Sequence, residues 1–375
     1  MKRGIKISVC ILLSSVALFC ACDKNLLAYD SFARFGTQTR WVYRDGEGNA
    51  KDTWEKLLAA EEEVEASVSS ERAESSVSRF NAAGAGESVE IDFTAYSLLQ
   101  TAKEIYEKTE GAYNPATGLL VDLWGFSPRF RAADYTPVTP YDRADPWREL
   151  PAEKYVQAFC TLCDFEGVRL YEEKGKYYAQ KPDVSAEIDG VTYTVRLDLG
   201  GIGKGLCADR ASSVLKEAGF SYGYFNLGGS SMCVLENPKS RTGEWEVGVI
   251  HPRAAGNYMT VSAKNVSLST SGDYELYYEI GGTRYCHIID PFTGYPVSAG
   301  EGGIVCASVI GLSGAEGDAT TTALMAMGRE KAVRYIEKFL CGVQASFVWQ
   351  NGDEYILYTN SDNYVLSVEW EVVRI

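Results

Sequence analysis

The residues from Asp198 to Gly205 carry the pattern with the most chemical content in this sequence. They read Asp-Leu-Gly-Gly-Ile-Gly-Lys-Gly and stand between an expected strand, Thr192–Leu197, and an expected helix, Ala208–Ala218. Glycines let backbone N–H groups approach a ligand, a helix N-terminus attracts anions, and Lys204 adds a positive charge. The pattern therefore predicts a phosphate site at a strand-to-helix turn. A tight turn with an incidental lysine remains the alternative, because the spacing matches neither a P-loop nor a dinucleotide fingerprint.

A second pattern lies at Gly317–Thr322, at the head of the expected last helix. Asp318 and Thr322 are four residues apart, so they share one face of a helical turn. A carboxylate and a hydroxyl presented together are oxygen ligands suited to Mg²⁺ or Ca²⁺ beside a phosphate. An ordinary helix cap at Asp318 is the competing interpretation.

The two histidines of the chain are His251 and His287. His287 ends an aromatic-rich strand and precedes a Pro and Gly turn, where a group that transfers protons near neutral pH would be exposed. His251 we expect to be structural. A polar turn at Ser269–Tyr274 either contacts a nucleotide base or simply turns the chain.

The elements that position these residues mix helices and strands without regular βαβ alternation, which predicts an α+β fold. Helices are expected at Thr53–Val68, Thr94–Thr109 and Asp318–Phe339, with an irregular serine-rich stretch at Ser69–Asn81. Strands are expected through Val168–Asp198 and Tyr222–Ser308 and as a final pair, Ala345–Trp349 and Glu354–Thr359, joined by a turn at Asn351-Gly352. Residues 126–150, with four prolines, are expected to be a surface loop or insertion.

The first 21 residues read as a secretory signal, with a basic start, an apolar run at Ile7–Phe19 and a small residue, Ala21, before Cys22. Leu18–Cys22 is similar to a bacterial lipobox, in which the cysteine is acylated, so we expect a lipoprotein signal peptide at 1–21, a membrane anchor on Cys22, a tether at 22–31 and a catalytic domain at 32–375. Removal of the signal takes the net charge from −15 to −18, which argues against nonspecific nucleic-acid binding.

Seven cysteines follow the anchor, an odd number at scattered positions. Cys160 and Cys163 have no second C-x-x-C and no nearby histidine, so a zinc site is not expected. Buried free thiols are the expectation, and a redox pair at Cys160 and Cys163 is the alternative.

Taken in order, these motifs resemble those of the ApbE family, the FAD:protein FMN transferases. The matching segments are Asp198–Gly205, Asn226–Gly229, Ser269–Tyr274, His287–Gly294 and Asp318–Leu324, preceded by Phe35–Thr37, Ser75–Asn81 and Gly111–Pro115. The resemblance extends over roughly Phe35–Phe339. It implies a single large α+β catalytic domain with mixed or antiparallel sheets flanked by helices, on the extracytoplasmic side of a membrane.

The resemblance also implies a reaction: cleavage of the FAD pyrophosphate, transfer of FMN to a Thr or Ser hydroxyl of a partner flavoprotein, and release of AMP. Lys204 would contact the pyrophosphate, His287 would be the base, and Gly201, Asp318 and Thr322 would hold Mg²⁺. Lys204, His287 and Asp318 are thus the implied catalytic residues. The implied FAD contacts are Phe35, Glu71, Ala112, Tyr113, Asn114, Asp198, Lys204, Ser271, His287 and Ile288.

Three positions depart from the family pattern. Glu71 stands where an aromatic residue usually packs on the flavin, Phe35 where methionine is common, and Asn114 where aspartate is common. The first change favours a second hypothesis, a Mg²⁺-dependent FAD pyrophosphatase that gives FMN and AMP. A flavin-binding lipoprotein without catalysis is the third hypothesis.

Overall fold

The structure, a computed structural model, describes residues 26–32, 34–127, 150–299 and 301–375. The predicted signal peptide and Cys22, and the predicted loop at 126–150 except for its two ends, lie outside the described residues. Within the described part of the chain, no helix is long and apolar enough to span a membrane.

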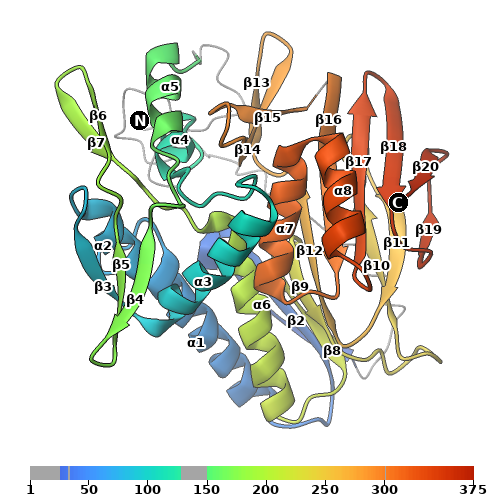
Figure 1. Cartoon of the computed structure of the whole chain (residues 1–375). Coiled ribbons are helices and arrows are strands. Elements are labelled where there is room, and N and C mark those ends of the chain that lie inside the picture. Colours follow the sequence, from blue (N-terminus) through green and yellow to red (C-terminus); the bar gives the residue numbers. More distant parts are fainter. Residues whose placement is uncertain (1–25, 33, 128–149, 300) are drawn as a thin grey trace, which may run out of the picture.

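A nine-stranded sheet runs through the molecule (Figure 1). Its order is β1 (Leu26–Phe32), β2 (Gln38–Arg44), β8 (Gly223–Leu227), β9 (Ser231–Val234), β12 (Val266–Gly272), β16 (Glu301–Ile310), β17 (Gln344–Asn351), β18 (Glu354–Thr359) and β20 (Glu371–Arg374). Neighbouring strands are antiparallel, except that β18 and β20 are parallel. Antiparallel order explains why short turns, such as Asn351-Gly352 between β17 and β18, suffice for several connections.

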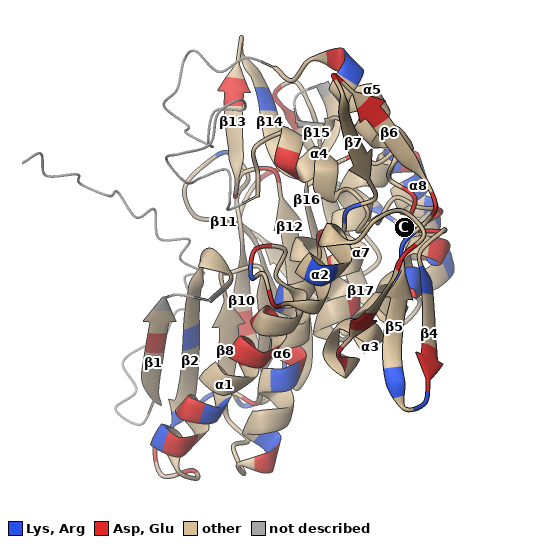
Figure 2. Ribbon diagram, turned by 90° about the vertical axis from the view of Figure 1, so that its left-hand side faces the viewer, with Lys and Arg blue, Asp and Glu red and all other residues tan. Residues whose placement is uncertain are grey.

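Both faces of this sheet are buried. One face is covered by helices α1 (Ala50–Val68), α6 (Gly200–Glu217) and α7 (Gly314–Met327), with α3 (Phe93–Lys108) and α8 (Arg329–Phe339) beside them (Figure 1). The other face packs against the sheet of β10 (Trp245–Ile250), β11 (Asn257–Ala263) and β19 (Tyr364–Leu366). Alternate side chains of one strand therefore enter different cores: Trp41 joins the helical side and Val42 the other. Figure 2 shows that the strands of the main sheet carry few charged residues, as burial on both faces requires.

Three smaller sheets and four short helices lie around the helical layer (Figure 1). The sheets are β3 (Ser88–Ile91) with β5 (Lys176–Gln180) and β4 (Arg169–Glu173); β6 (Ser185–Ile188) with β7 (Val191–Thr194); and β13 (Tyr277–Ile280) with β14 (Thr283–Ile289) and β15 (Pro296–Ala299). The short helices are η1 (Arg34–Gly36), α2 (Ser76–Ala82), α4 (Gly118–Leu123) and α5 (Glu153–Thr161). The predicted α+β class is confirmed.

Several local predictions are corrected. The predicted tether is a strand from Leu26 on, because β1 pairs with β2 along its whole length. The stretch predicted as irregular contains α2, which Ser75 caps by accepting the N–H of Ser78. Helix α6 begins at Gly200, so its first turns contain the glycines that were predicted to form a turn.

The last helix is two helices, because Gly328 adopts a φ of 73° between α7 and α8. Helix α7 begins earlier than predicted, with Ser313 as its cap in a capping box with Glu316. Asp318 is therefore not the cap, and its carboxylate is available for another role.

Candidate active site

The carboxylate of Asp318 is the buried centre of the site. Its residue is only 7% exposed, and burial raises the pKa of this carboxyl to about 6, although the positive charge of Lys204 opposes that rise. Three groups from other elements donate to it: the Gly205 N–H at 2.7 Å, the Ser269 hydroxyl at 2.7 Å, and the Ser231 hydroxyl at 2.9 and 2.8 Å to its two oxygens. Helix α6 and strands β9 and β12 thus fix the orientation of one carboxylate on α7.

Glycines bring α6 and α7 into backbone contact around this carboxylate. A Cβ atom on Gly205 would lie 2.0 Å from the carbonyl oxygen of Gly314. One turn earlier in α6, a Cβ atom on Gly201 would lie 3.2 Å from Thr322 Oγ1 and 3.6 Å from Tyr113 Cε2. Gly201, Thr322 and Tyr113 are therefore neighbours, and Thr322 Oγ1 also donates to the Asp318 carbonyl at 3.0 Å.

This arrangement suits a hard divalent cation better than a soft one. The three predicted metal-binding residues are neighbours, because Gly201 lies beside Thr322 and Thr322 stands one helical turn after Asp318. By residue type they can offer a backbone carbonyl, a hydroxyl and a carboxylate. No group of three or more His, Cys, Asp or Glu residues that could hold a metal occurs among the described residues. A site with one carboxylate relies on water and phosphate oxygens for its remaining ligands, which is the usual situation of Mg²⁺.

Lys204 stands in the first turns of α6 and is half-buried. It lies close enough to Asp318 to lower the pKa of that carboxyl, but within the described part of the chain it forms no ion pair. A lysine beside a helix N-terminus attracts a phosphate by charge and by the orientation of the helix dipole. The glycine pattern from which a phosphate site was predicted thus forms a helix N-terminus rather than a loop.

Asp198 precedes α6 and is held by one local and one long-range hydrogen bond. Its Oδ1 accepts the Gly200 N–H at 2.8 Å, and its own N–H donates to the Pro115 carbonyl at 2.8 Å. The side-chain amide of Asn81 pairs with both backbone groups of Leu197, at 2.9 and 2.7 Å. Burial raises the pKa of the Asp198 carboxyl.

Tyr113 and its two neighbours form a rigid turn after α3. Tyr113 is 3% exposed, and its hydroxyl has no hydrogen-bond partner among the described residues. Asn114 is tied to the protein itself, since Nδ2 donates to the Cys163 carbonyl at 2.8 Å and Oδ1 accepts the Ala116 N–H at 2.8 Å. Ala112 is buried. Of these three predicted FAD contacts, Tyr113 thus presents an unsatisfied polar group to the site.

Phe35 and Glu71 lie on the α1 side of the site. Phe35 has a φ of 49°, unusual for a non-glycine residue, and its N–H donates to Glu65 Oε1 at 2.7 Å. Its ring reaches α6, where Cε1 would lie 3.2 Å from a Cβ atom on Gly203. Glu71 is exposed in the loop before α2, and its N–H donates to the Ser69 hydroxyl at 3.1 Å.

The remaining predicted residues come from β12 and β14. The Ser271 hydroxyl lies 2.8 Å from Thr321 Oγ1, which places it against α7 next to Thr322. The Nδ1 atom of His287 lies 3.2 Å from the Leu276 carbonyl oxygen. A carbonyl oxygen only accepts, so Nδ1 carries the proton in this contact and Nε2 is the basic nitrogen. Ile288 is buried, so its side chain supports β14.

Some groups around the site were not singled out in the sequence. The hydroxyls of Ser231 and Ser269 donate to the Asp318 carboxylate, and neither role was predicted. The available signals were their positions: Ser269 opens the Ser269–Tyr274 motif, and Ser231 closely follows the Asn226–Gly229 motif. The seven described cysteines are free thiols. Four are buried as expected (Cys207, Cys233, Cys286 and Cys306), whereas Cys160 and Cys163 are half-buried and Cys341 is exposed.

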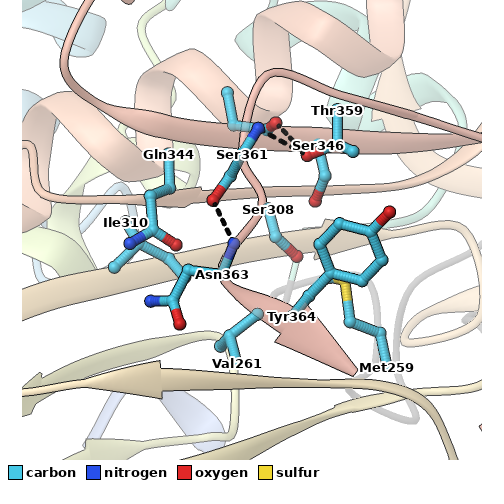
Figure 3. Close-up of a pocket in the computed structure, with 11 residues that line it drawn as sticks. Met259, Val261, Ser308, Ile310, Gln344, Ser346, Thr359, Ser361, Asn363 and Tyr364 are labelled. Carbon is cyan, nitrogen blue, oxygen red and sulfur yellow. Dashed lines mark hydrogen bonds between the residues drawn. The ribbon is translucent and has the colours of Figure 1, made fainter. Parts of the chain in front are cut away.

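A pocket on the other face of the sheet is not part of this site (Figure 3). It lies between the main sheet and the β10–β11–β19 sheet and is lined by uncharged residues such as Met259, Ser308, Gln344 and Tyr364. Its cavity volume of about 10 Å³ leaves room for about one water molecule. The pocket is therefore too small for a nucleotide.

Comparison with known proteins gives a consistent result. The family model of the ApbE family matches residues 35–347. An FAD:protein FMN transferase of Treponema pallidum (strain Nichols) is 29% identical over 310 residues, which is 79% of this chain and 76% of that protein. A protein of the same name from Rhodobacter capsulatus is 33% identical over 310 residues, 81% of this chain and 47% of that protein.

Solved structures share the fold. The flavin transferase ApbE from Vibrio cholerae superposes with a TM-score of 0.70 at 24% identity, covering 89% of this chain and 96% of that one. The ApbE protein of Thermotoga maritima gives a TM-score of 0.70 at 25% identity, covering 88% and 97%. From the family match over most of its length, this chain belongs to the ApbE family.

Proposed function

We propose that this protein is a Mg²⁺-dependent FAD:protein FMN transferase, which moves FMN from FAD to a Thr or Ser hydroxyl of a partner flavoprotein and releases AMP. The observation that carries the proposal is the contact of Gly201 with Thr322, one turn from the buried Asp318, beside Lys204 at the start of α6. The names of the relatives support the choice of FAD as substrate and of a flavoprotein as acceptor.

In this proposal each residue of the site has a defined role. Lys204 and the N–H groups at the start of α6 bind the pyrophosphate. Gly201, Asp318 and Thr322 would hold Mg²⁺, which supplies charge neutralisation on the phosphates when bound. Ser231 and Ser269 keep the Asp318 carboxylate oriented.

The transfer balances as follows. The acceptor hydroxyl oxygen forms a bond to the phosphorus on the FMN side, and the bond from that phosphorus to the bridging oxygen breaks. AMP leaves with the bridging oxygen. The hydroxyl proton goes to His287 Nε2, which the Nδ1 contact with Leu276 leaves basic.

The exposed Glu71 favours a second candidate function, hydrolysis of FAD to FMN and AMP. A carboxylate offers no aromatic face to cover the flavin, so water would reach the phosphorus more readily than a protein hydroxyl would. The same site residues would then act on water instead of an acceptor.

The test is incubation of the purified chain with FAD and Mg²⁺, with and without a flavoprotein domain that carries the hydroxyl target. An acceptor heavier by one FMN, with equimolar AMP, supports transfer. FMN and AMP in equal amounts, with the acceptor unchanged, reject transfer and support the pyrophosphatase. Neither product, with Mg²⁺ present, rejects both.

We also propose that the chain is exported and anchored in a membrane through a lipid on Cys22, facing the extracytoplasmic side. The support is the lipobox-like sequence Leu18–Cys22 behind an apolar run. Mass spectrometry of the N-terminal peptide tests it: an acylated Cys22 as first residue is expected, and an intact Met1 would reject it.

A further inference from the structure

The hydroxyl of Tyr113 is a buried polar group that the fold leaves unsatisfied. The residue is 3% exposed, yet no described residue accepts or donates a hydrogen bond at its oxygen. Burying a hydroxyl without a partner costs on the order of 1–3 kcal/mol. Such a group beside the paired carboxylates Asp198 and Asp318 points to a partner that binds from outside the chain.

The position of Tyr113 is fixed by neighbours on both sides. Its N–H donates to Thr109 Oγ1 at 3.1 Å, at the end of α3. Its ring edge faces the start of α6: a Cβ atom added to Gly201 would lie 3.6 Å from Tyr113 Cε2 and 3.2 Å from Thr322 Oγ1. The ring therefore lies between α3 and the α6–α7 contact that carries the site.

The groups near this hydroxyl are mainly hydrogen-bond acceptors, but none of them accepts its proton. The charges of Asp198 and Asp318 act on it, but neither carboxylate accepts its proton. Asp198 is occupied by the Gly200 N–H, and Asp318 by Ser231, Ser269 and the Gly205 N–H. A tyrosine is a neutral donor at pH 7, so the missing partner is an acceptor.

We propose that the Tyr113 hydroxyl donates a hydrogen bond to a pyrophosphate oxygen of the dinucleotide bound at the start of α6, opposite Lys204. This inference rests on the proposed function, because it assumes that a pyrophosphate binds there. It adds a residue that holds the reacting group from the α3 side. A donor held in place before the ligand arrives stabilises negative charge in the transition state without reorganisation.

Tyr113→Phe tests the inference, since it removes only the hydroxyl. We expect the affinity for FAD and for inorganic pyrophosphate, each with Mg²⁺, to fall about 10-fold to 100-fold, as for loss of a hydrogen bond to a charged group. Riboflavin, which has no phosphate, should bind equally to both proteins. The melting temperature without ligand should stay equal or rise, because the variant no longer buries an unsatisfied hydroxyl. Calorimetric titration of the full chain in detergent measures the affinities.

Tyr106→Phe is the matched control. Tyr106 lies on α3 near the same turn and packs its ring edge-on against Phe165. We expect unchanged affinity for pyrophosphate in this variant.

Three results would overturn the inference. The first is equal pyrophosphate affinity in Tyr113→Phe and wild type, and the second is a parallel loss of riboflavin binding in the variant. The third is a loss of Mn²⁺ binding by the variant in the absence of phosphate, which would place the hydroxyl on the water shell of a cation. Failure of the proposed function looks different: the wild type would bind pyrophosphate in a Tyr113-dependent way and yet yield neither flavinylated acceptor nor AMP from FAD. A wild type that does not bind pyrophosphate contradicts both.

Discussion

Gly201 and Thr322 face each other across helices α6 and α7, although they are 121 positions apart in the chain. A Cβ atom on Gly201 would stand 3.2 Å from Thr322 Oγ1, which is closer than most such contacts but is made to the end of a side chain. At Gly205 the same atom would stand 2.0 Å from a backbone oxygen of Gly314. The two glycines therefore serve different purposes: Gly205 lets the helices meet, and Gly201 leaves room at the proposed cation site.

Gly201→Ala should fold and lose cation binding. The new methyl group displaces the Thr322 hydroxyl by a few tenths of an ångström, while alanine favours the helix by about 1 kcal/mol. We expect a melting temperature close to wild type and Mn²⁺ affinity lowered about tenfold, measured by calorimetry. Unchanged Mn²⁺ affinity would contradict the assignment of Gly201.

Gly205→Ala should be strongly destabilised. Its methyl group meets backbone that cannot move without separating α6 from α7, so we expect a loss of more than about 4 kcal/mol in unfolding free energy, measured by urea denaturation. A variant as stable as wild type would show that the helices do not approach as described.

Ser231→Ala should weaken cation binding without unfolding the protein. The Ser231 hydroxyl donates to both oxygens of Asp318, and loss of such an orienting group typically costs 10-fold to 100-fold in metal affinity. Mn²⁺ titration measures the effect. Ser213→Ala is the control, because that hydroxyl donates only to the Asp209 carbonyl elsewhere on α6. Equal losses in both variants would remove the special role of Ser231.

Lys181 should make stability rise with pH. It is 1% exposed and donates to the carbonyls of Asn81 and Ala83, and burial lowers its pKa from 10.5 to about 8. Between these two pKa values the unfolded chain binds a proton that the folded chain does not bind, so the unfolding free energy increases with pH. The increase in unfolding free energy begins near pH 8 and is complete above pH 10.5.

The comparison with Lys181→Met isolates this contribution. From pH 7.5 to 9.5 the unfolding free energy of the wild type should increase by about 2 kcal/mol more than that of the variant. Urea denaturation at the two pH values gives the difference. Parallel behaviour of the two proteins, or the opposite sign, would mean that Lys181 is not desolvated.

Glu71→Tyr should shift products from free FMN toward flavinylated acceptor. An aromatic ring at this exposed position can stack on the flavin, which is worth about 0.5–1.5 kcal/mol, so we expect the ratio of transfer to hydrolysis to rise about tenfold. Chromatography of FMN and mass analysis of the acceptor give this ratio. Glu74→Tyr, on the same exposed loop, should leave it unchanged, and an equal shift in that control would contradict a specific role for position 71.

Local patterns in the sequence predicted much of the fold. The helices at Thr53–Val68 and Thr94–Thr109 were found within a few residues of α1 and α3, because amphipathic spacing and end residues are local signals. The helix break at Gly328 and the start of α6 at Gly200 were missed. Glycine disfavours a helix by itself, and only the packing of α6 against α7 makes a glycine-rich first turn favourable.

The sequence predicted individual residues of the site, but it did not predict how they are arranged in space. The spacing of Asp318 and Thr322 showed that they share a helix face, whereas their meeting with Gly201 and Ser231 depends on tertiary contacts. The same limit applies to Asn81, whose pairing with Leu197 spans 116 positions. The unsatisfied hydroxyl of Tyr113 became visible only once burial and partners were known.

The most direct measurement compares wild type with Asp318→Ala in the presence of FAD, Mg²⁺ and an acceptor flavoprotein. The wild type should add one FMN to the acceptor and release one AMP, and removal of Mg²⁺ or of the Asp318 carboxylate should abolish both products. Undiminished flavinylation in Asp318→Ala, or in wild type without a divalent cation, would contradict the account.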